Sequence, residues 1–207
     1  MEELTLEELA ELISGITQFN PASYQYFNQL LNHRTVIFNQ DVDENIIETV
    51  YIPLRDFEKD DSKKPVTLIL NSTGGSSADG FFLAHYIATY KKKLNIIVPG
   101  YATSIATIIL CGGGKNENVT RYCYPNSYAL IHDGFITMQT QEAKSAADIM
   151  TFNDRVDKDI RQFVIDNTNI TAEQYDAQTR KQWFITAEEM KQFNMIDKII
   201  TKEDDPV

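Results

Sequence analysis

A single hydroxyl stands in an apolar stretch of the chain. Residues 100–110 read GYATSIATIIL, so Ser104 follows the apolar run LNIIVP and a Pro-Gly turn. A serine between a strand and a helix can cap the helix, and it can also serve as a nucleophile. The helix expected to start here is apolar on nearly every face, which predicts that it lies in the core. The amide of Ile105, directly after the serine, is then a candidate donor to a developing oxyanion.

A glycine turn precedes a helix earlier in the chain. In LILNSTGGSSADG a strand ends at Asn71, and the chain turns through Gly74 and Gly75. Glycines permit backbone conformations that leave amides facing outward, and a helix N-terminus adds partial positive charge. The turn is a candidate cradle for an oxyanion or a phosphate, although the phosphate-loop pattern GxxxxGK[ST] is absent. With Ile105, the Gly75 amide would form a two-donor hole worth about 2.7–4 kcal/mol per donor; an ordinary turn is the alternative.

A nucleophilic serine needs a base, and the chain contains three histidines. His33 precedes the first expected strand and His85 lies in an amphipathic helix, so surface or packing roles are expected for both. His132 ends the strand-like YALIH and opens a loop, a place where functional side chains concentrate. His132 is therefore the histidine whose position best fits a base; a non-catalytic residue at the end of a strand is the alternative.

The elements that must position these residues alternate between strands and helices. Apolar runs predict strands at 34–38, 66–70, 94–98, 120–124, 128–132, 183–186 and 197–201. Helical spacing predicts helices at 5–14, 24–32, 41–61, 80–93, from near 104, and at 142–167, 171–180 and 187–193. The alternation indicates an α/β fold with parallel strands and crossover helices. We expect an N-terminal segment at 1–20, one domain at 21–201 with the 142–167 helix protruding as a handle, and a disordered acidic tail at 202–207.

Composition narrows the classes of partner. The 207 residues carry a formal charge of −11, which disfavours nucleic acid because phosphate binding relies on clustered Lys and Arg. Cys111 and Cys123 form no metal-ligand pattern, and two thiols favour a reducing cytoplasm. The acidic start lacks the features of an export signal, and no apolar run reaches the ~20 residues that span a bilayer. We therefore expect a soluble cytoplasmic protein with no metal, no cofactor and no membrane partner.

Four stretches carry a resemblance to a known family. In order and approximate spacing, LNSTGGSSADG, GYATSIATIIL, YCYPNSYALIHD and WFITAEEM resemble motifs of the Clp protease proteolytic subunit (ClpP) family. The likeness runs from about Leu31 to Ile200. It implies a crotonase-like fold and a serine peptidase with Ser104 as nucleophile, His132 as base, and Gly75 and Ile105 at the oxyanion positions.

The sequence departs from the family at two positions. The family has an Asp where this chain has Gln182, before Trp183-Phe184. Replacing the triad Asp by Asn in a chymotrypsin-type protease costs about 10⁴ in turnover, or ~5 kcal/mol. The Gln carbonyl oxygen can still accept from His132 Nδ1–H, so reduced or conditional activity is expected; Asp133 and Asp176 are nearby acids that could substitute. Thr73 replaces a family Pro and can adopt the same conformation.

Two hypotheses follow. In the favoured one, the chain is a serine endopeptidase that cuts unfolded polypeptide through an acyl-enzyme, without metal or cofactor. The resemblance implies a homo-oligomer of stacked seven-membered rings that encloses the active sites and is fed by an AAA+ unfoldase, with the long helix at the ring-to-ring contact. In the other, the chain is a structural or regulatory subunit that retains Ser104 and His132 by descent. A crotonase-type acyl-thioester enzyme would need no nucleophile, so Ser104 with His132 argues against it, and a phage protease remains a variant of the first hypothesis.

Overall fold

The computed structural model of the chain describes residues 32–132, 143–179 and 181–202. The chain forms two compact units, residues 1–35 and residues 36–207. All of the candidate site residues belong to the second unit. The helices expected at 5–14 and 24–32 belong to the first and, apart from residue 32, lie outside the described residues, as does the segment 1–20.

A five-stranded sheet is the main feature of the second unit. Its strand order is β1-β2-β3-β5-β8, and the pairs β2/β3, β3/β5 and β5/β8 are parallel. Apolar strands buried on both faces are typical of parallel sheets. The prediction of an α/β fold with crossover helices is confirmed. The strands are β1 (Thr35–Phe38), β2 (Val66–Leu70), β3 (Leu94–Val98), β5 (Val119–Cys123) and β8 (Lys198–Ile199).

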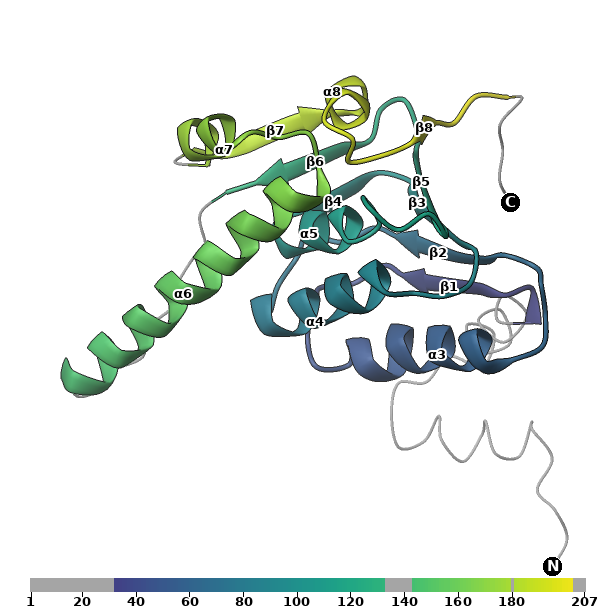
Figure 1. Cartoon of the computed structure of the whole chain (residues 1–207), viewed down its shortest axis with the longest axis horizontal. Helices are drawn as coiled ribbons and strands as arrows, with labels where there is room; N and C mark the ends of the chain where they lie inside the picture. The colour runs from purple at the N-terminus through teal and green to yellow at the C-terminus, as the bar shows by residue number, and fades with distance from the viewer. Residues whose placement is uncertain (1–31, 133–142, 180, 203–207) are drawn as a thin grey trace, which may run out of the picture. The chain divides into compact units, whose positions relative to one another are not determined.

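Helices α3 (Ile52–Lys59), α4 (Ser77–Ala88) and α5 (Ile105–Cys111) follow one another along one face of this sheet (Figure 1). α4 and α5 approach closely at Gly80, where an added Cβ would lie 2.4 Å from Ile105 Cγ1. Glycine is required here because a side chain would push α5 away. The close contact holds the start of α5, and with it the residue after Ser104.

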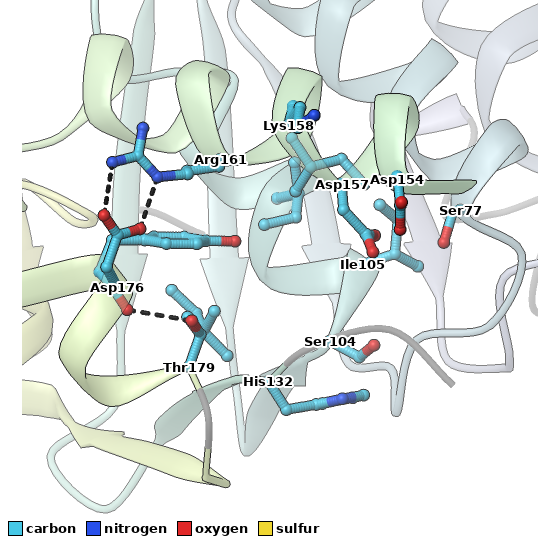
Figure 2. A pocket seen from close by; sticks show the side chains of 14 residues that line it. Ser77, Ser104, Ile105, His132, Asp154, Asp157, Lys158, Arg161, Asp176 and Thr179 are labelled. Atoms are coloured by element: carbon cyan, nitrogen blue, oxygen red, sulfur yellow. Dashed lines mark hydrogen bonds and ion pairs between the residues drawn. The ribbon is translucent and has the colours of Figure 1, made fainter. Parts of the chain in front are cut away.

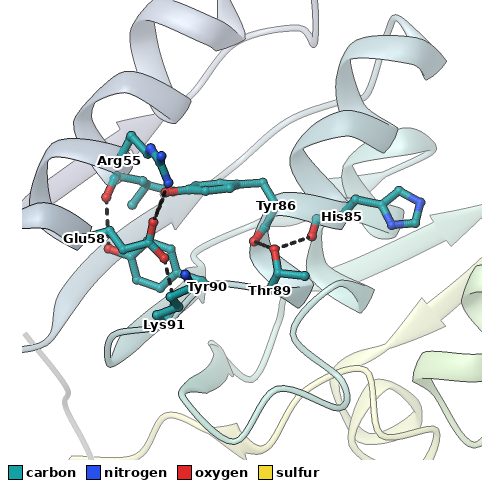
Figure 3. Close-up of polar contacts among 8 residues, drawn as sticks. Arg55, Glu58, His85, Tyr86, Thr89, Tyr90 and Lys91 are labelled. Atoms are coloured by element: carbon teal, nitrogen blue, oxygen red, sulfur yellow. Dashed lines mark hydrogen bonds and ion pairs between the residues drawn. The ribbon is translucent and has the colours of Figure 1, made fainter.

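A buried carboxylate joins α3 to α4 (Figure 3). Glu58 accepts hydrogen bonds from the Arg55 guanidinium at 3.1 Å, the Tyr86 hydroxyl at 3.3 Å and the Lys91 amide at 2.9 Å. Burial, followed by the charge of Glu58, raises the pKa of Tyr86. The Tyr90 hydroxyl, just beyond α4, donates to the Leu54 carbonyl at 3.1 Å, so Tyr86 of α4 and Tyr90 after it both anchor α3.

A second, three-stranded sheet carries the candidate residues. It contains β4 (Tyr101–Thr103), β6 (Tyr128–Ile131) and β7 (Trp183–Thr186), with β4 parallel and β7 antiparallel to β6. β4 was not predicted, because three residues between a Pro-Gly turn and a helix are too few to reveal an alternating pattern. The antiparallel pairing of β7 was also not expected.

Several helix boundaries differ from the predictions. The helix expected from 41 begins with a π-helical turn, η1 (Ile47–Tyr51), because Val42 is taken up in a parallel bridge with Gly75. α4 ends at Ala88 and not at residue 93. Lys92 beyond it forms an ion pair with Asp60 at 2.8 Å, so it serves a loop contact and not the helix end.

The long helix α6 (Ala143–Asn167) confirms the helix expected at 142–167. Its C-terminal part enters the core, where Phe163 packs edge-on against Phe81 and His85. Further towards its N-terminal end, Phe152 is 64% exposed. Two shorter helices, α7 (Ala172–Gln178) and α8 (Ala187–Gln192), flank β7, and both begin with a capping box.

Candidate active site

Three candidate residues lie at one edge of the three-stranded sheet. Ser104 directly follows β4 and His132 directly follows the parallel strand β6, whereas Gln182 directly precedes the antiparallel strand β7. Parallel strands end at the same edge, and an antiparallel neighbour begins there. The strand order β4-β6-β7 therefore brings Ser104, His132 and Gln182 to one edge in that order.

Ser104 has an unusual backbone conformation, with φ of 57° and ψ of −128°. A non-glycine residue in such a region costs of order 1–3 kcal/mol and persists only where its surroundings hold it. The Ser104 amide donates to the Leu130 carbonyl at 2.8 Å, which fixes the turn to β6. The side chain makes no capping hydrogen bond to α5, so the alternative that Ser104 caps this helix is wrong.

The Ser104 side chain lines a pocket of about 300 Å³, and His132 lines the same pocket. Figure 2 shows the two side chains next to each other, with the α6 residues Asp154, Asp157 and Lys158 across the pocket from them. Ile105, Ile108 and Ile131 supply an apolar part of the lining. The structure thus brings the two residues together across 28 positions of sequence in a cavity large enough for a side chain.

The glycine turn abuts the Ser104 turn. Gly74 and Gly75 have φ of 97° and 146°, conformations that L residues rarely adopt. A Cβ on Gly74 would lie 2.7 Å from Ser104 Cβ, and one on Gly75 would lie 2.2 Å from the Val42 carbonyl oxygen. Both glycines are therefore required, one by the approach to Ser104 and the other by the bridge to Val42.

Two backbone amides are candidate donors near Ser104. In the bridge, Val42 N donates to Gly74 O and Ser76 N donates to Val42 O, each at 2.7 Å. The residue between the two bonds, Gly75, turns its own N–H to the side away from Val42. Ile105 is the first residue of α5, and amides of a first turn have no acceptor inside their helix.

Thr73 makes two hydrogen bonds in the position where the family has proline. Its hydroxyl binds the Asp41 carboxylate, and its carbonyl accepts from the Thr103 hydroxyl at 2.8 Å. These contacts hold the turn from both sides. They supply by hydrogen bonding the restriction that a proline ring would supply covalently.

Gln182 does not line the pocket, and it is exposed. Of the two acids considered as substitutes, Asp133 lies outside the described residues and Asp176 lines the pocket. The Asp176 carboxylate binds Arg161 of α6 at 2.6 and 2.7 Å (Figure 2), and this contact raises the pKa of Arg161. Sequence reasoning missed Arg161, because no motif joins two polar residues on separate helices.

The structure also describes His85, the two cysteines and the side chains that could bind a metal. His85 packs edge-on against Phe81 with ring centroids 4.5 Å apart, which agrees with the expected packing role. Cys111 and Cys123 are buried free thiols.

Within 32–132, 143–179 and 181–202, no three His, Cys, Asp or Glu side chains come together as metal ligands. Of the helices described, none is both long and apolar enough to cross a membrane.

Comparisons with known proteins identify the family of the chain. A family model described as Clp protease matches residues 18–203. The chain is also 26% identical over 189 residues to ATP-dependent Clp protease proteolytic subunit 1 of Bacillus cereus, an alignment that covers 90% of this chain and 95% of the relative. Since the family model matches most of its length, the chain belongs to the Clp protease family.

Proposed function

We propose that the chain is a serine endopeptidase subunit of a Clp-type assembly, with Ser104 as its nucleophile. One observation carries the proposal: Ser104 and His132 line the same pocket, and the Ser104 hydroxyl makes no capping bond to the helix behind it. A serine in a strained turn between a strand and a helix presents its Oγ in the manner of a nucleophile elbow. Membership of the family supports peptide-bond hydrolysis as the reaction.

The proposed reaction proceeds through an acyl-enzyme. His132 takes the proton of Ser104 Oγ as this oxygen attacks the scissile carbonyl carbon, and the oxyanion binds the amides of Gly75 and Ile105. His132 then gives the proton to the leaving amine as the C–N bond breaks. A water molecule attacks the ester with His132 again as base, which releases the acid product and restores Ser104. No metal or cofactor takes part in these steps.

Gln182 takes the place of the triad acid in this proposal. Its side-chain carbonyl can accept a hydrogen bond from His132 Nδ1–H and so keep the tautomer in which Nε2 is basic. An amide carries no charge, so the imidazolium that forms in the transition state gains less stabilisation than beside a carboxylate. We therefore propose reduced turnover relative to an enzyme with aspartate here.

The oligomeric state of the enzyme and its partner are proposed from its family. A homo-oligomer of stacked heptameric rings would enclose the pockets, and an ATP-dependent AAA+ unfoldase would deliver unfolded polypeptide. An extended substrate would bind by main-chain hydrogen bonds to a strand edge, whatever its sequence. The free, buried thiols of Cys111 and Cys123 support a reducing, cytoplasmic location.

A second candidate function is that of a structural or regulatory subunit. The observation that favours it is the uncharged, exposed Gln182 at the position of the triad acid. Such a subunit would keep the pocket but would not hydrolyse peptides.

Hydrolysis of a fluorogenic peptide separates the two. The parent chain, Ser104→Ala and the matched control Ser77→Ala are compared, because Ser77 also supplies a hydroxyl to the pocket. A peptidase predicts turnover by the parent and Ser77→Ala, and loss of at least about 10³-fold in Ser104→Ala. Equal hydrolysis by all three proteins, or none by an intact oligomer of the parent, contradicts the proposal.

A further inference from the structure

Helix α5 contains one buried hydroxyl that the proposed reaction does not use. Thr107 is 0% exposed and lies in the apolar segment IATIILC. Burying a hydroxyl is unfavourable unless it is hydrogen-bonded. Thr107 is not among the residues that line the pocket, whereas Ile105 and Ile108 of the same helix are. Its role is therefore inside the protein.

The Thr107 hydroxyl joins three elements that meet at the site. It lies 2.7 Å from the carbonyl oxygen of Ala102 in β4 and 2.9 Å from that of Leu130 in β6. A helical threonine ordinarily bonds the carbonyl three or four residues before it in its own helix. Here both acceptors lie in strands, so the single hydroxyl proton, shared between the two carbonyls, ties α5 to the strand before Ser104 and to the strand that leads to His132.

The Leu130 carbonyl is the point where these contacts meet. It accepts from the Ser104 amide at 2.8 Å as well as lying within reach of the Thr107 hydroxyl. A carbonyl oxygen has two lone pairs and can serve both donors. The Ser104 amide and the Thr107 hydroxyl are therefore both held to one carbonyl oxygen of β6, two residues before His132.

We infer that Thr107 is a positioning residue, which holds the strained Ser104 turn against the end of β6 and thereby sets the alignment of Ser104 with His132. The inference rests on the proposed function and adds a residue to it. A strained conformation persists only where several contacts determine it. Loss of one contact would let the turn relax, and a displacement of about 1 Å between reacting groups can cost about 10²-fold in rate.

The test compares Thr107→Val, which keeps the shape but removes the hydroxyl, with Thr107→Ser, which keeps the hydroxyl. Thr67→Val in β2 is the matched control, since it removes a buried hydroxyl from a strand outside the pocket lining. We expect Thr107→Val to lower kcat for a peptide by about tenfold to a hundredfold with little change in KM. Thr107→Ser is expected to restore most of kcat, and Thr67→Val to leave kcat near that of the parent.

Hydrogen exchange measured by mass spectrometry gives a readout that does not depend on activity. In Thr107→Val, segments 101–106 and 128–132 should exchange at least several-fold faster than in the parent, and Thr107→Ser should remain close to the parent. Unchanged exchange and unchanged kcat in Thr107→Val overturn the inference. An inactive parent whose exchange responds to Thr107→Val would instead overturn the proposed function, while the anchoring of the turn by Thr107 would stand.

Discussion

The β6–β7 ladder ends one residue short of His132 and Gln182. Its last pair joins Ile131 to Trp183; His132 directly follows Ile131, and Gln182 directly precedes Trp183. Residues directly opposite in antiparallel strands have Cβ atoms about 4.5–5.5 Å apart. Continued by one residue, this register would place Gln182 opposite His132, as the proposed role of Gln182 requires.

This relationship predicts a gain of activity for Gln182→Asp. A carboxylate opposite His132 would stabilise the imidazolium, so kcat for a peptide should rise by about tenfold or more, within the ~10⁴ that separates Asp from an amide in a chymotrypsin-type triad. Gln178→Asp in α7 is the matched control, because it adds the same charge at an exposed position outside the pocket lining. Equal kcat in the parent and Gln182→Asp, with the fold intact, would show that residue 182 does not act on His132.

Asp176, one of the three aspartates that line the pocket, is expected not to replace the triad aspartate. Both oxygens of the Asp176 carboxylate bind the Arg161 guanidinium, which competes with any imidazole for them. We expect Asp176→Asn to change kcat by less than about threefold and to leave the pH at half-maximal activity in place. A shift of that midpoint, measured with the same peptide between pH 5 and 9, would assign the role of His132 partner to Asp176.

Strand and helix positions could largely be predicted from the sequence. VTLIL and LNIIV have the length and apolar character of buried strands, and they became β2 and β3 without a change of bounds. The pairing partners could not be predicted in this way, because local periodicity carries no information on which strands meet. β4 in particular is defined by its partners Ser72 and β6.

The candidate site, too, could be predicted only in part. The types of Ser104 and His132 and their places after strands were visible in the sequence, while their convergence was implied only by the family resemblance. The Leu130 carbonyl, which is distant in sequence, accepts from the amide of Ser104, a residue of positive φ, and is one of the two contacts of Thr107. The position of Arg161 depends on how α6 packs and had no sequence signal.

The ion pair between the buried Arg121 and the partly exposed Asp197 should be costly to break. Arg121 is 1% exposed and its side chain donates to both Asp197 carboxylate oxygens, at 2.8 and 3.1 Å, and to Asn194. Removal of one partner leaves the other charge buried, which typically costs 3–5 kcal/mol. Asp197→Ala should therefore lower the free energy of unfolding in urea by about 3 kcal/mol, the lower end because this carboxylate is partly exposed.

The control for this prediction is Asp159→Ala on the exposed surface of α6. We expect it to change the free energy of unfolding by at most about 0.5 kcal/mol. A loss in Asp197→Ala no larger than that of the control would mean that Arg121 finds other acceptors.

The two thiols should be inert in the folded protein. Burial raises the pKa of Cys111 and of Cys123 from 9.0 to about 12. The neutral form is therefore favoured by folding, so this contribution to stability is complete below pH 9 and is lost as the pH rises from 9 towards 12. At pH 8, a disulfide reagent should modify the protein in urea and leave the folded protein unmodified.

The double variant Cys111→Ala/Cys123→Ala checks the sign of this pH dependence. Its free energy of unfolding should fall less steeply between pH 9 and 11 than that of the parent. A steeper fall, or rapid modification of both thiols in the folded parent, would contradict the assigned pKa direction.

The most direct measurement of whether Ser104 is an activated nucleophile is covalent labelling with a fluorophosphonate, followed by peptide mapping. We predict one adduct per chain, on the peptide that contains Ser104, and its absence from both Ser104→Ala and His132→Ala. An intact oligomer that takes up no label, or an adduct on another residue with Ser104 unmodified, would contradict the assignment of Ser104 as the nucleophile.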